Sequence, residues 1–274
     1  MKSRKILLVA LILSTTLWSG SVPPAVAGPS FPNRMAAIGD SITRAANAWG
    51  WYGDHPRNSW STGSSRFDGV RSHYERILAV KPAIAGQNHN DAVSGAKMSD
   101  AQSQASRAVS QGAQYVTILM GANDACTSSR STMTSVEDFR AQFQSAMEAL
   151  QSGLPNARIF VSSIPNIYRL WQIYHENWLA RTVWRLARIC QSMLSRSNTE
   201  EDRQAVLARV QAFNDVLAEV CGQYANCRFD GLAVFNYPFE RRHISKLDYF
   251  HPSLAGQAAL ASTTWSASWW PQAG

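Results

Sequence analysis

The feature that most constrains the fold is a regular alternation between short apolar segments and longer helical patterns. Short runs of β-type composition end at turn residues, and they are Arg34–Ile38, Ala83–Gln87, Tyr115–Met120, Arg158–Ser162 and Arg228–Phe229. Patterns with helical character lie between them, at Val70–Leu78, Ser99–Ser110, Ser135–Gln151, Glu200–Tyr224 and Ser253–Ser262. This alternation predicts a parallel sheet covered by helices on both faces. Such sheets bind ligands beyond the carboxyl ends of their strands, so residues with chemical roles should directly follow the strands.

The first residues have the pattern of a secretory signal peptide. Three cations within residues 1–5 precede an apolar run at Ile6–Trp18, and the small-residue sequence Ala25–Ala27 follows. The apolar run is shorter than the span of about 20 residues that a membrane anchor needs. We therefore expect cleavage after Ala27, which would remove residues 1–27 as a signal peptide and leave a single secreted domain at residues 28–274.

The charge of the chain argues against nucleic acid as a partner. Removal of the three cations near the start lowers the net charge from +7 to +4, and no run of five basic residues occurs. This mild excess is compatible with transient contact with an anionic membrane surface. We expect a monomer with no nucleic-acid partner.

The cysteines are Cys126, Cys190, Cys221 and Cys227. An even number in an exported chain predicts two disulfides, which four cysteines can form in three ways. Cys221 and Cys227 bracket the short stretch "GQYAN", so we expect this pair to form one bridge and Cys126–Cys190 the other. The chain has no CxxC pair with matching histidines, so we expect no metal and no cofactor.

A serine follows the first predicted strand, in "GDSITRA". Ser41 would lie at the edge of the sheet, where a helix is expected to begin and where N–H groups favour negative charge. Read alone, Ser41 is better explained as the N-cap of that helix, because a serine hydroxyl is inert until a base takes its proton.

Two further candidates follow the second and third strands. Gly95 in "AVSGA" can let a backbone N–H approach a ligand closely, and Asn123 in "GANDA" can donate its amide to a developing oxyanion. Each residue on its own is also explained by a turn.

The last segment with chemical potential is "LDYFHPSLAGQ". His251 can act as a general base, and Asp248, three residues earlier, can orient it and stabilise its cation. The remaining histidines lack a comparable setting and are interpreted as surface or packing residues: His55, His73, His89, His175 and His243.

These blocks, in this order along the chain, resemble those of the GDSL, or SGNH, hydrolase family. The matching stretches are "GDSIT", "AVSGA", "GANDA" and "DYFHPS", and Ile42 replaces the leucine of the eponymous motif. The resemblance extends from Gly39 to Pro252. It implies a three-layer α/β/α sandwich whose central, mainly parallel sheet has about five strands in a flavodoxin-like arrangement.

The resemblance also implies a mechanism. Ser41 would be the nucleophile, His251 its base and Asp248 the residue that orients the base. The oxyanion would be held by the N–H groups of Ser41 and Gly95 and by the side chain of Asn123. Asp40 and Asp124 are interpreted as a turn residue and a loop residue.

The substrate question depends on aromatic stretches. The segment "NAWGWYGDHPRNSWSTG" looks like an insertion of secreted phospholipase A/B-type members, and it supplies candidates for substrate binding: Arg44, Trp49, Trp51, Arg57 and Trp60. The arginines can meet a phosphate, and the aromatic rings can line an acyl groove, touch a lipid interface or form a sugar platform. Trp171, Tyr174 and Trp178 share one face of a predicted helix, which packs into the core or forms a lid.

We therefore expect a secreted carboxylic ester hydrolase that acts on lipids, with phospholipase A/B or lysophospholipase activity. The alternative is a carbohydrate esterase that removes acetyl groups from polysaccharides or glycans. A wall- or lipid-binding module without catalysis is a third hypothesis, but the intact Ser–Asn–Asp–His set argues against it.

Overall fold

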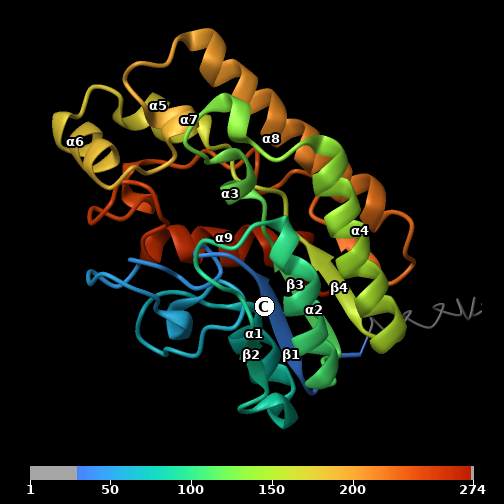
Figure 1. The fold of residues 1–274 in the computed structure, drawn as a ribbon. Helices are drawn as coiled ribbons and strands as arrows, with labels where there is room; N and C mark the ends of the chain where they lie inside the picture. The colour runs from blue at the N-terminus through green and yellow to red at the C-terminus, as the bar shows by residue number, and fades with distance from the viewer. Residues whose placement is uncertain (1–29, 273–274) are drawn as a thin grey trace, which may run out of the picture.

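The computed structural model describes residues 30–272 of the chain (Figure 1). The predicted signal peptide at residues 1–27 and its cleavage site lie outside the described residues. None of the helices within residues 30–272 combines the length and the apolar character that crossing a membrane requires.

The centre of the fold is a parallel sheet of five strands in the order β2-β1-β3-β4-β5. The strands are β1 (Met35–Gly39), β2 (Asn88–Asn90), β3 (Tyr115–Leu119), β4 (Arg158–Val161) and β5 (Cys227–Phe229). This order is that of the flavodoxin-like doubly wound folds, in which the chain reverses direction across the sheet at β1 and β3. The predicted α/β sandwich with a central parallel sheet is confirmed.

Helices cover both faces of the sheet (Figure 1). They are α1 (His73–Val80), α2 (Ala101–Ser110), α3 (Ala122–Ala125), α4 (Val136–Gly153), α5 (Tyr168–Tyr174), α6 (Trp178–Leu186), α7 (Gln191–Leu194), α8 (Glu200–Cys221) and α9 (Leu254–Ala267). The helices α2, α4 and α8 pack against one another on one side. The helices α5, α6 and α7 lie together beyond one end of the sheet (Figure 1).

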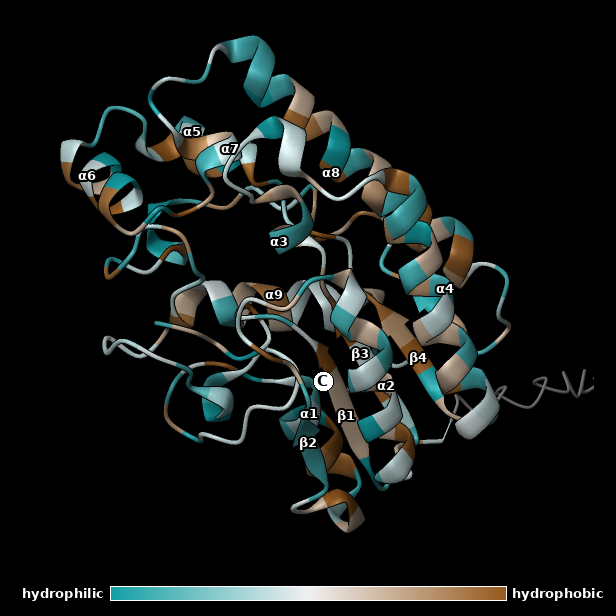
Figure 2. Cartoon of the chain, in the orientation of Figure 1, coloured by the Kyte–Doolittle hydropathy of each residue, from teal (hydrophilic) through white to brown (hydrophobic). Residues whose placement is uncertain are grey.

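Each strand divides its side chains between two apolar layers, because successive residues point to opposite faces. Ala36 and Val116 pack in the layer of α2, α4 and α8, whereas Met35, Tyr115 and Phe160 pack with residues of α1 and α9. All five side chains are fully buried. Most of β1 and β4 is accordingly drawn in hydrophobic brown in Figure 2, as expected for a sheet covered on both faces.

Hydroxyl side chains define the starts of four helices. Each accepts a hydrogen bond from a backbone N–H in the first turn of its helix, and they are Ser72, Ser135, Thr199 and Ser253. Such caps satisfy N–H groups that have no partner within the helix. The helices predicted from the sequence begin within about three residues of these caps.

The second predicted strand was wrong. Residues Ala83–Gln87 form part of a 3-10 helix and a turn at Gly86, and the strand is instead the polar stretch Asn88–Asn90. This edge strand is polar because its side chains bond the loop that covers it: the Asn88 amide donates to the Thr62 carbonyl, and the Asn90 amide to Thr62 Oγ1.

The predicted helical face of Trp171, Tyr174 and Trp178 does not exist, because the segment forms two helices. The chain leaves α5 after Tyr174, and Asn177 starts α6 by accepting a hydrogen bond from the Ala180 N–H. Tyr174 is buried and Trp171 is half-buried, but Trp178 is 69 % exposed. The core interpretation therefore holds for Tyr174 and is wrong for Trp178.

Both expected disulfides are present. Cys126 and Cys190 are bonded, as are Cys221 and Cys227. The first joins the segment after α3 to the start of α7, and the second joins the end of α8 to β5. The Cys126–Cys190 bond therefore links the segment that contains α5 and α6 to the edge of the sheet where β3 ends.

Candidate active site

Ser41 lies two residues beyond the carboxyl end of β1, in a tightly packed turn. A side chain at Gly39 would come within 2.7 Å of the Leu119 carbonyl oxygen, so this position needs glycine. The glutamine Gln104 of α2 fixes the same backbone, since its amide bonds both the N–H and the carbonyl of Gly39. Ser41 is held at the end of the strand with 8 % of its surface exposed.

The helix predicted after Ser41 is a series of turns. Ala45 and Asn47 adopt left-handed conformations, with φ of 51° and 56°, and these interrupt regular helical hydrogen bonding. The serine is therefore not an N-cap in this structure. Its hydroxyl has another partner.

Three side chains form a hydrogen-bonded chain across the carboxyl edge of the sheet. Ser41 Oγ lies 2.8 Å from His251 Nε2, and His251 Nδ1 lies 2.6 Å from Asp248 Oδ2. The residues come from opposite ends of the sequence, because the carboxyl end of β1 and the segment before α9 meet at the same edge. The structure thus brings together the three residues predicted to act as nucleophile, base and orienting acid.

Asp248 accepts several hydrogen bonds that fix its orientation. Its Oδ1 accepts from the N–H groups of Phe250 and His251, and its Oδ2 also accepts from Asn47 Nδ2 at 2.5 Å. Burial by itself would raise the pKa of Asp248, but the hydrogen bond and charge of His251 and the Asn47 amide outweigh burial and lower it. Asp248 is therefore an ionised carboxylate aimed at the imidazole.

The predicted oxyanion donors Gly95 and Asn123 lie on a loop after β2 and on the neighbouring helix α3. The chain after β2 runs beside β1, since the Val93 N–H donates to the Gly39 carbonyl, and Gly95 follows with a φ of +85°. Asn123 uses one N–H of its amide to bond the Ala96 carbonyl at 2.9 Å, which leaves its second N–H available. Within residues 30–272, no protein group accepts a hydrogen bond from the N–H of Ser41 or Gly95.

Two buried carboxyl groups support these loops. Asp40 accepts a hydrogen bond from the Ile42 N–H, as a turn residue would, and burial raises the pKa of Asp40 to about 7. Asp124 is not in a loop but in α3. It bonds the Met98 N–H and the Thr134 hydroxyl, and so ties the Gly95 loop to the helix that carries Asn123. Burial also raises the pKa of Asp124.

The predicted substrate-binding residues divide into three groups. Trp49 and Trp51 are exposed, at 46 % and 72 %, and Arg57 is exposed as well. Arg44 is half-buried and pairs with Asp54 at 3.0 Å. Trp60 is fully buried and donates its indole N–H to Thr43 Oγ1, so its assignment to substrate binding was wrong.

A narrow apolar groove opens beside the hydrogen-bonded chain, with a volume of about 50 Å³. Its walls include the sequence neighbours of Ser41, Asn123 and His251 together with residues of the β4–α5 segment and α5: Ile42, Ala122, Phe250, Pro252, Ile167 and Leu170. The groove therefore lies next to the hydrogen-bonded chain. Sequence reasoning missed both this groove and the role of Asn47, whose contact with Asp248 spans 201 residues.

The arrangement has the parts that acyl transfer requires. An imidazole between a serine hydroxyl and a buried carboxylate can take the hydroxyl proton, and free N–H groups nearby can stabilise negative charge on oxygen. Within the described part of the chain, no group of three or more His, Cys, Asp or Glu side chains is placed to hold a metal ion.

Comparisons with known proteins agree with this chemistry. The family model described as GDSL-like Lipase/Acylhydrolase matches residues 35–263. The membrane-associated phospholipase B1 of Mus musculus is 24 % identical over 225 residues, which cover 70 % of this chain and 15 % of that protein. This chain thus spans about 15 % of the length of that relative.

A solved structure shares the fold. A protein described as a GDSL-like lipase, from Parabacteroides merdae ATCC 43184, aligns with a TM-score of 0.53 and 18 % identity, covering 85 % of this chain and 94 % of that chain. The matched family, the shared fold and the hydrogen-bonded chain of Ser41, His251 and Asp248 lead to one conclusion. The chain belongs to the GDSL-like lipase/acylhydrolase family.

Proposed function

We propose that this hydrolase acts outside the cell on the carboxyl esters of lipids, with phospholipase A/B or lysophospholipase activity. The observation that carries the proposal is the apolar groove lined by the sequence neighbours of Ser41, Asn123 and His251. A groove lined by Ile42, Leu170 and Phe250 favours an acyl chain, because burying apolar surface stabilises the complex by about 25 cal/mol per Å². The likeness to a phospholipase B1 supports the same substrate class.

In the proposed reaction, Ser41 Oγ attacks the ester carbonyl while His251 Nε2 takes the hydroxyl proton. Asp248 keeps the imidazole in the required tautomer and stabilises its cation. The carbonyl oxygen becomes negative and accepts hydrogen bonds from the N–H groups of Ser41 and Gly95 and from Asn123 Nδ2.

The acyl-enzyme is then resolved by water. His251 gives its proton to the departing alcohol, which in a phospholipid is the glycerol hydroxyl, and then takes a proton from the water that attacks the ester on Ser41. His251 returns this proton to Ser41 Oγ as the bond to the acyl group breaks, which restores the hydroxyl and releases the fatty acid. We place this chemistry outside the cell because disulfides form and persist in oxidising compartments, and the chain has two.

A paired assay tests the substrate class. The purified protein is incubated with phosphatidylcholine and lysophosphatidylcholine in one arm and with acetylated xylan in the other, and released fatty acid and acetate are measured. We expect fatty acid release that is lost in Ser41→Ala. Release of acetate without fatty acid would contradict the proposal and make the chain a carbohydrate esterase.

A second test concerns the groove itself. Leu170→Trp fills the groove and should lower the ratio of kcat/KM for p-nitrophenyl decanoate to that for p-nitrophenyl acetate by about ten-fold. This ratio is measured within one preparation, so a loss of folded protein does not affect it. Val80→Trp, at an exposed site on α1, is the control and should leave the ratio unchanged. An unchanged ratio in Leu170→Trp would show that the acyl chain lies elsewhere.

A further inference from the structure

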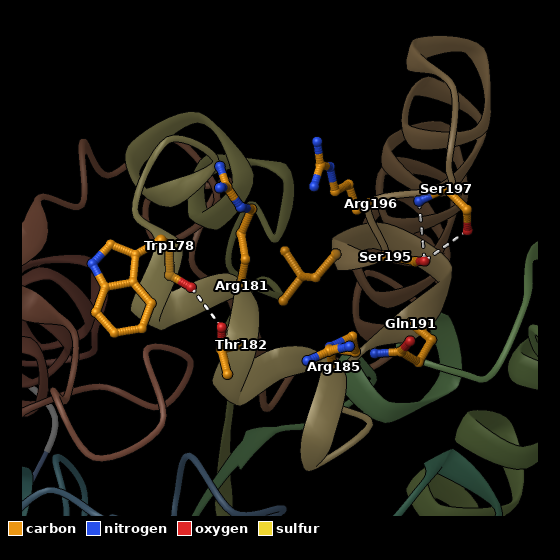
Figure 3. Close-up of a pocket in the computed structure, with 9 residues that line it drawn as sticks. Trp178, Arg181, Thr182, Arg185, Gln191, Ser195, Arg196 and Ser197 are labelled. Atoms are coloured by element: carbon orange, nitrogen blue, oxygen red, sulfur yellow. Dashed lines mark hydrogen bonds between the residues drawn. The ribbon is translucent and has the colours of Figure 1, made fainter.

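A second depression lies apart from the catalytic residues, between α6 and the segment that joins α7 to α8. It has a volume of about 590 Å³ and is lined by polar and cationic groups, among them Arg181, Arg185, Ser195, Arg196 and Ser197. Figure 3 shows Arg181 and Arg185 on α6 and Arg196 on the opposite side of the depression. No acidic side chain lines it.

Among the residues that the structure describes, no acidic side chain forms an ion pair with the arginines of this region. Residues 178–197 contain Arg181, Arg185, Arg188 and Arg196, and they contain no Asp or Glu. Arg181 donates to the backbone carbonyl of His175. Within residues 30–272, the side chains of the other three arginines form no hydrogen bond, ion pair or ring contact. Guanidinium groups of this kind are suited to phosphate groups, whose oxygens can accept two hydrogen bonds from one arginine.

Large apolar side chains are exposed on the same helix. Trp178, Leu179 and Leu186 are 69 %, 41 % and 72 % exposed, whereas Ala180 and Trp184 on the inner side of α6 are buried. Figure 2 shows hydrophilic and hydrophobic residues alternating along α6. A helix that presents Trp and Leu beside several arginines has the composition of segments that lie in a membrane interface.

This surface is attached directly to the catalytic edge. The indole N–H of Trp184 donates to the carbonyl of Tyr249, which lies between Asp248 and His251 in the sequence. The disulfide from Cys190 leads to Cys126, at the end of the helix that carries Asn123. A lipid surface that binds α6 would therefore lie beside the segments that carry the reactive residues.

A second surface region also combines an exposed aromatic ring with two arginines, but acidic side chains lie beside its arginines. Phe67 is 95 % exposed, and Arg66 and Arg71 line a neighbouring depression, but Asp68 and Glu75 line the same depression. This region combines an aromatic ring and two arginines as α6 does, with carboxylates close by. It provides matched control positions.

We propose that α6 and the α7–α8 segment form a docking surface for an anionic phospholipid bilayer. Arg181, Arg185 and Arg196 contact lipid phosphate groups, and Trp178 and Leu186 enter the interface. The biological role of this surface rests on the proposed function, since docking would bring the groove to its lipid substrate. Binding of the protein to a bilayer does not itself require catalysis.

The test measures binding in a Ser41→Ala background, so that the lipids stay intact. The protein is sedimented with vesicles of phosphatidylcholine alone or of an equimolar mixture with phosphatidylglycerol. We expect tighter binding to the mixed vesicles, which weakens as salt rises. Arg181→Gln/Arg185→Gln should weaken it by roughly 25-fold, because each arginine near an anionic surface contributes about five-fold.

The control variant is Arg66→Gln/Arg71→Gln, which removes the same charge and should retain binding. Likewise, Trp178→Ala should weaken binding and Phe67→Ala should not. An equal loss in both arginine pairs, or no loss in either, would overturn the docking surface. Binding of inorganic phosphate that depends on Arg181 and Arg185, without vesicle binding, would also overturn it and indicate a site for a free anion.

The outcomes separate this inference from the proposed function. Vesicle binding that depends on α6, in a protein that releases no fatty acid, would support the docking surface and contradict the substrate assignment. Fatty acid release from dispersed lysophosphatidylcholine without α6-dependent vesicle binding would overturn the docking surface and leave the substrate assignment in place.

Discussion

Two histidines in this molecule have similar hydrogen bonds and very different surroundings. His251 bonds a carboxylate through Nδ1 and the Ser41 hydroxyl through Nε2. His73 also uses both ring nitrogens, with the Tyr115 and Thr264 hydroxyls each 2.8 Å away. The difference is that the His251 side chain is 17 % exposed and beside an acid, whereas His73 is fully buried with neutral partners.

The comparison shows what separates a reactive imidazole from one that packs. Burial, helped by the positive charge of Arg76, lowers the pKa of His73 to about 3, so this ring stays neutral at ordinary pH. A general base must become charged during the reaction, and a neighbouring carboxylate stabilises that charge. Asp248 gives His251 such a partner, and no acid lies against His73 in the contacts that its ring makes.

The largest expected effect comes from removing the exposed imidazole. His251→Ala should lower kcat by about 10⁴- to 10⁶-fold, because Ser41 then has no base. The rate is measured with p-nitrophenyl butyrate and normalised to folded protein. Ser41→Ala should lower it equally, and the double variant should be no worse than either single one. A His251→Ala protein within ten-fold of the unaltered enzyme would place the reactive base elsewhere.

A smaller loss of kcat is expected when the carboxylate beside His251 is replaced by a neutral group, like the neutral partners of His73. Asp248→Asn should lower kcat by about 10³- to 10⁴-fold, because an amide neither stabilises the imidazolium nor selects the same tautomer. Asn47→Ala keeps the carboxylate and removes one hydrogen bond to it, so about ten-fold or less is expected. If the two variants lost activity equally, the charge of Asp248 would not be its contribution.

The next effect concerns the oxyanion donor. Asn123→Ala should lower kcat by about 10²- to 10³-fold and change the melting temperature little, since the Asn123 side chain is half-buried and bonds one carbonyl. Kinetics and thermal unfolding are measured on the same preparation. A fall in melting temperature with kcat preserved would show that this amide only supports the Gly95 loop.

Much of the catalytic edge could be predicted because it follows from chain order. The apolar stretches of β1, β3 and β4 locate those strands, and residues after parallel strands must share one edge. That rule, together with the family resemblance, is enough to place Ser41 and Asn123 near each other. His251 and Asp248 then complete the set because they lie only three residues apart in the sequence.

The remainder depended on tertiary contacts that leave little trace in sequence. Asn47 reaches Asp248 because the chain turns with a positive φ at Asn47, and no periodicity predicts such a turn. Trp60 was assigned to substrate from its position in an aromatic stretch, but its loop folds over the sheet and buries it. Two signals were available: Asn177 could have marked the start of α6, and the four arginines of residues 178–197 occur without an acid.

The last prediction tests the buried member of the pair. Between about pH 3 and pH 6.5 the folded protein binds fewer protons at His73 than the unfolded chain does. The contribution of His73 to the free energy of unfolding therefore falls as the pH is lowered through this range. His73→Phe removes the titration and strands two hydroxyls, so it should be about 2 kcal/mol less stable than the unaltered protein at pH 7.

Acidification should reduce this deficit. Urea unfolding at pH 7, 5.5 and 4 should show the stability of His73→Phe, relative to the unaltered protein, rise by about 3 kcal/mol at the lowest pH, because the penalty of charging His73 is absent from the variant. The deficit of about 2 kcal/mol at pH 7 should therefore become an advantage of about 1 kcal/mol at pH 4. Activity per folded molecule should stay unchanged, since the His73 ring bonds two other hydroxyls and does not contact Ser41 through a hydrogen bond. Shifts of other groups, including Asp40, occur in both proteins and cancel in the difference. A deficit that stays constant with pH would mean that His73 titrates as an exposed imidazole does, and burial would then not be what separates it from His251.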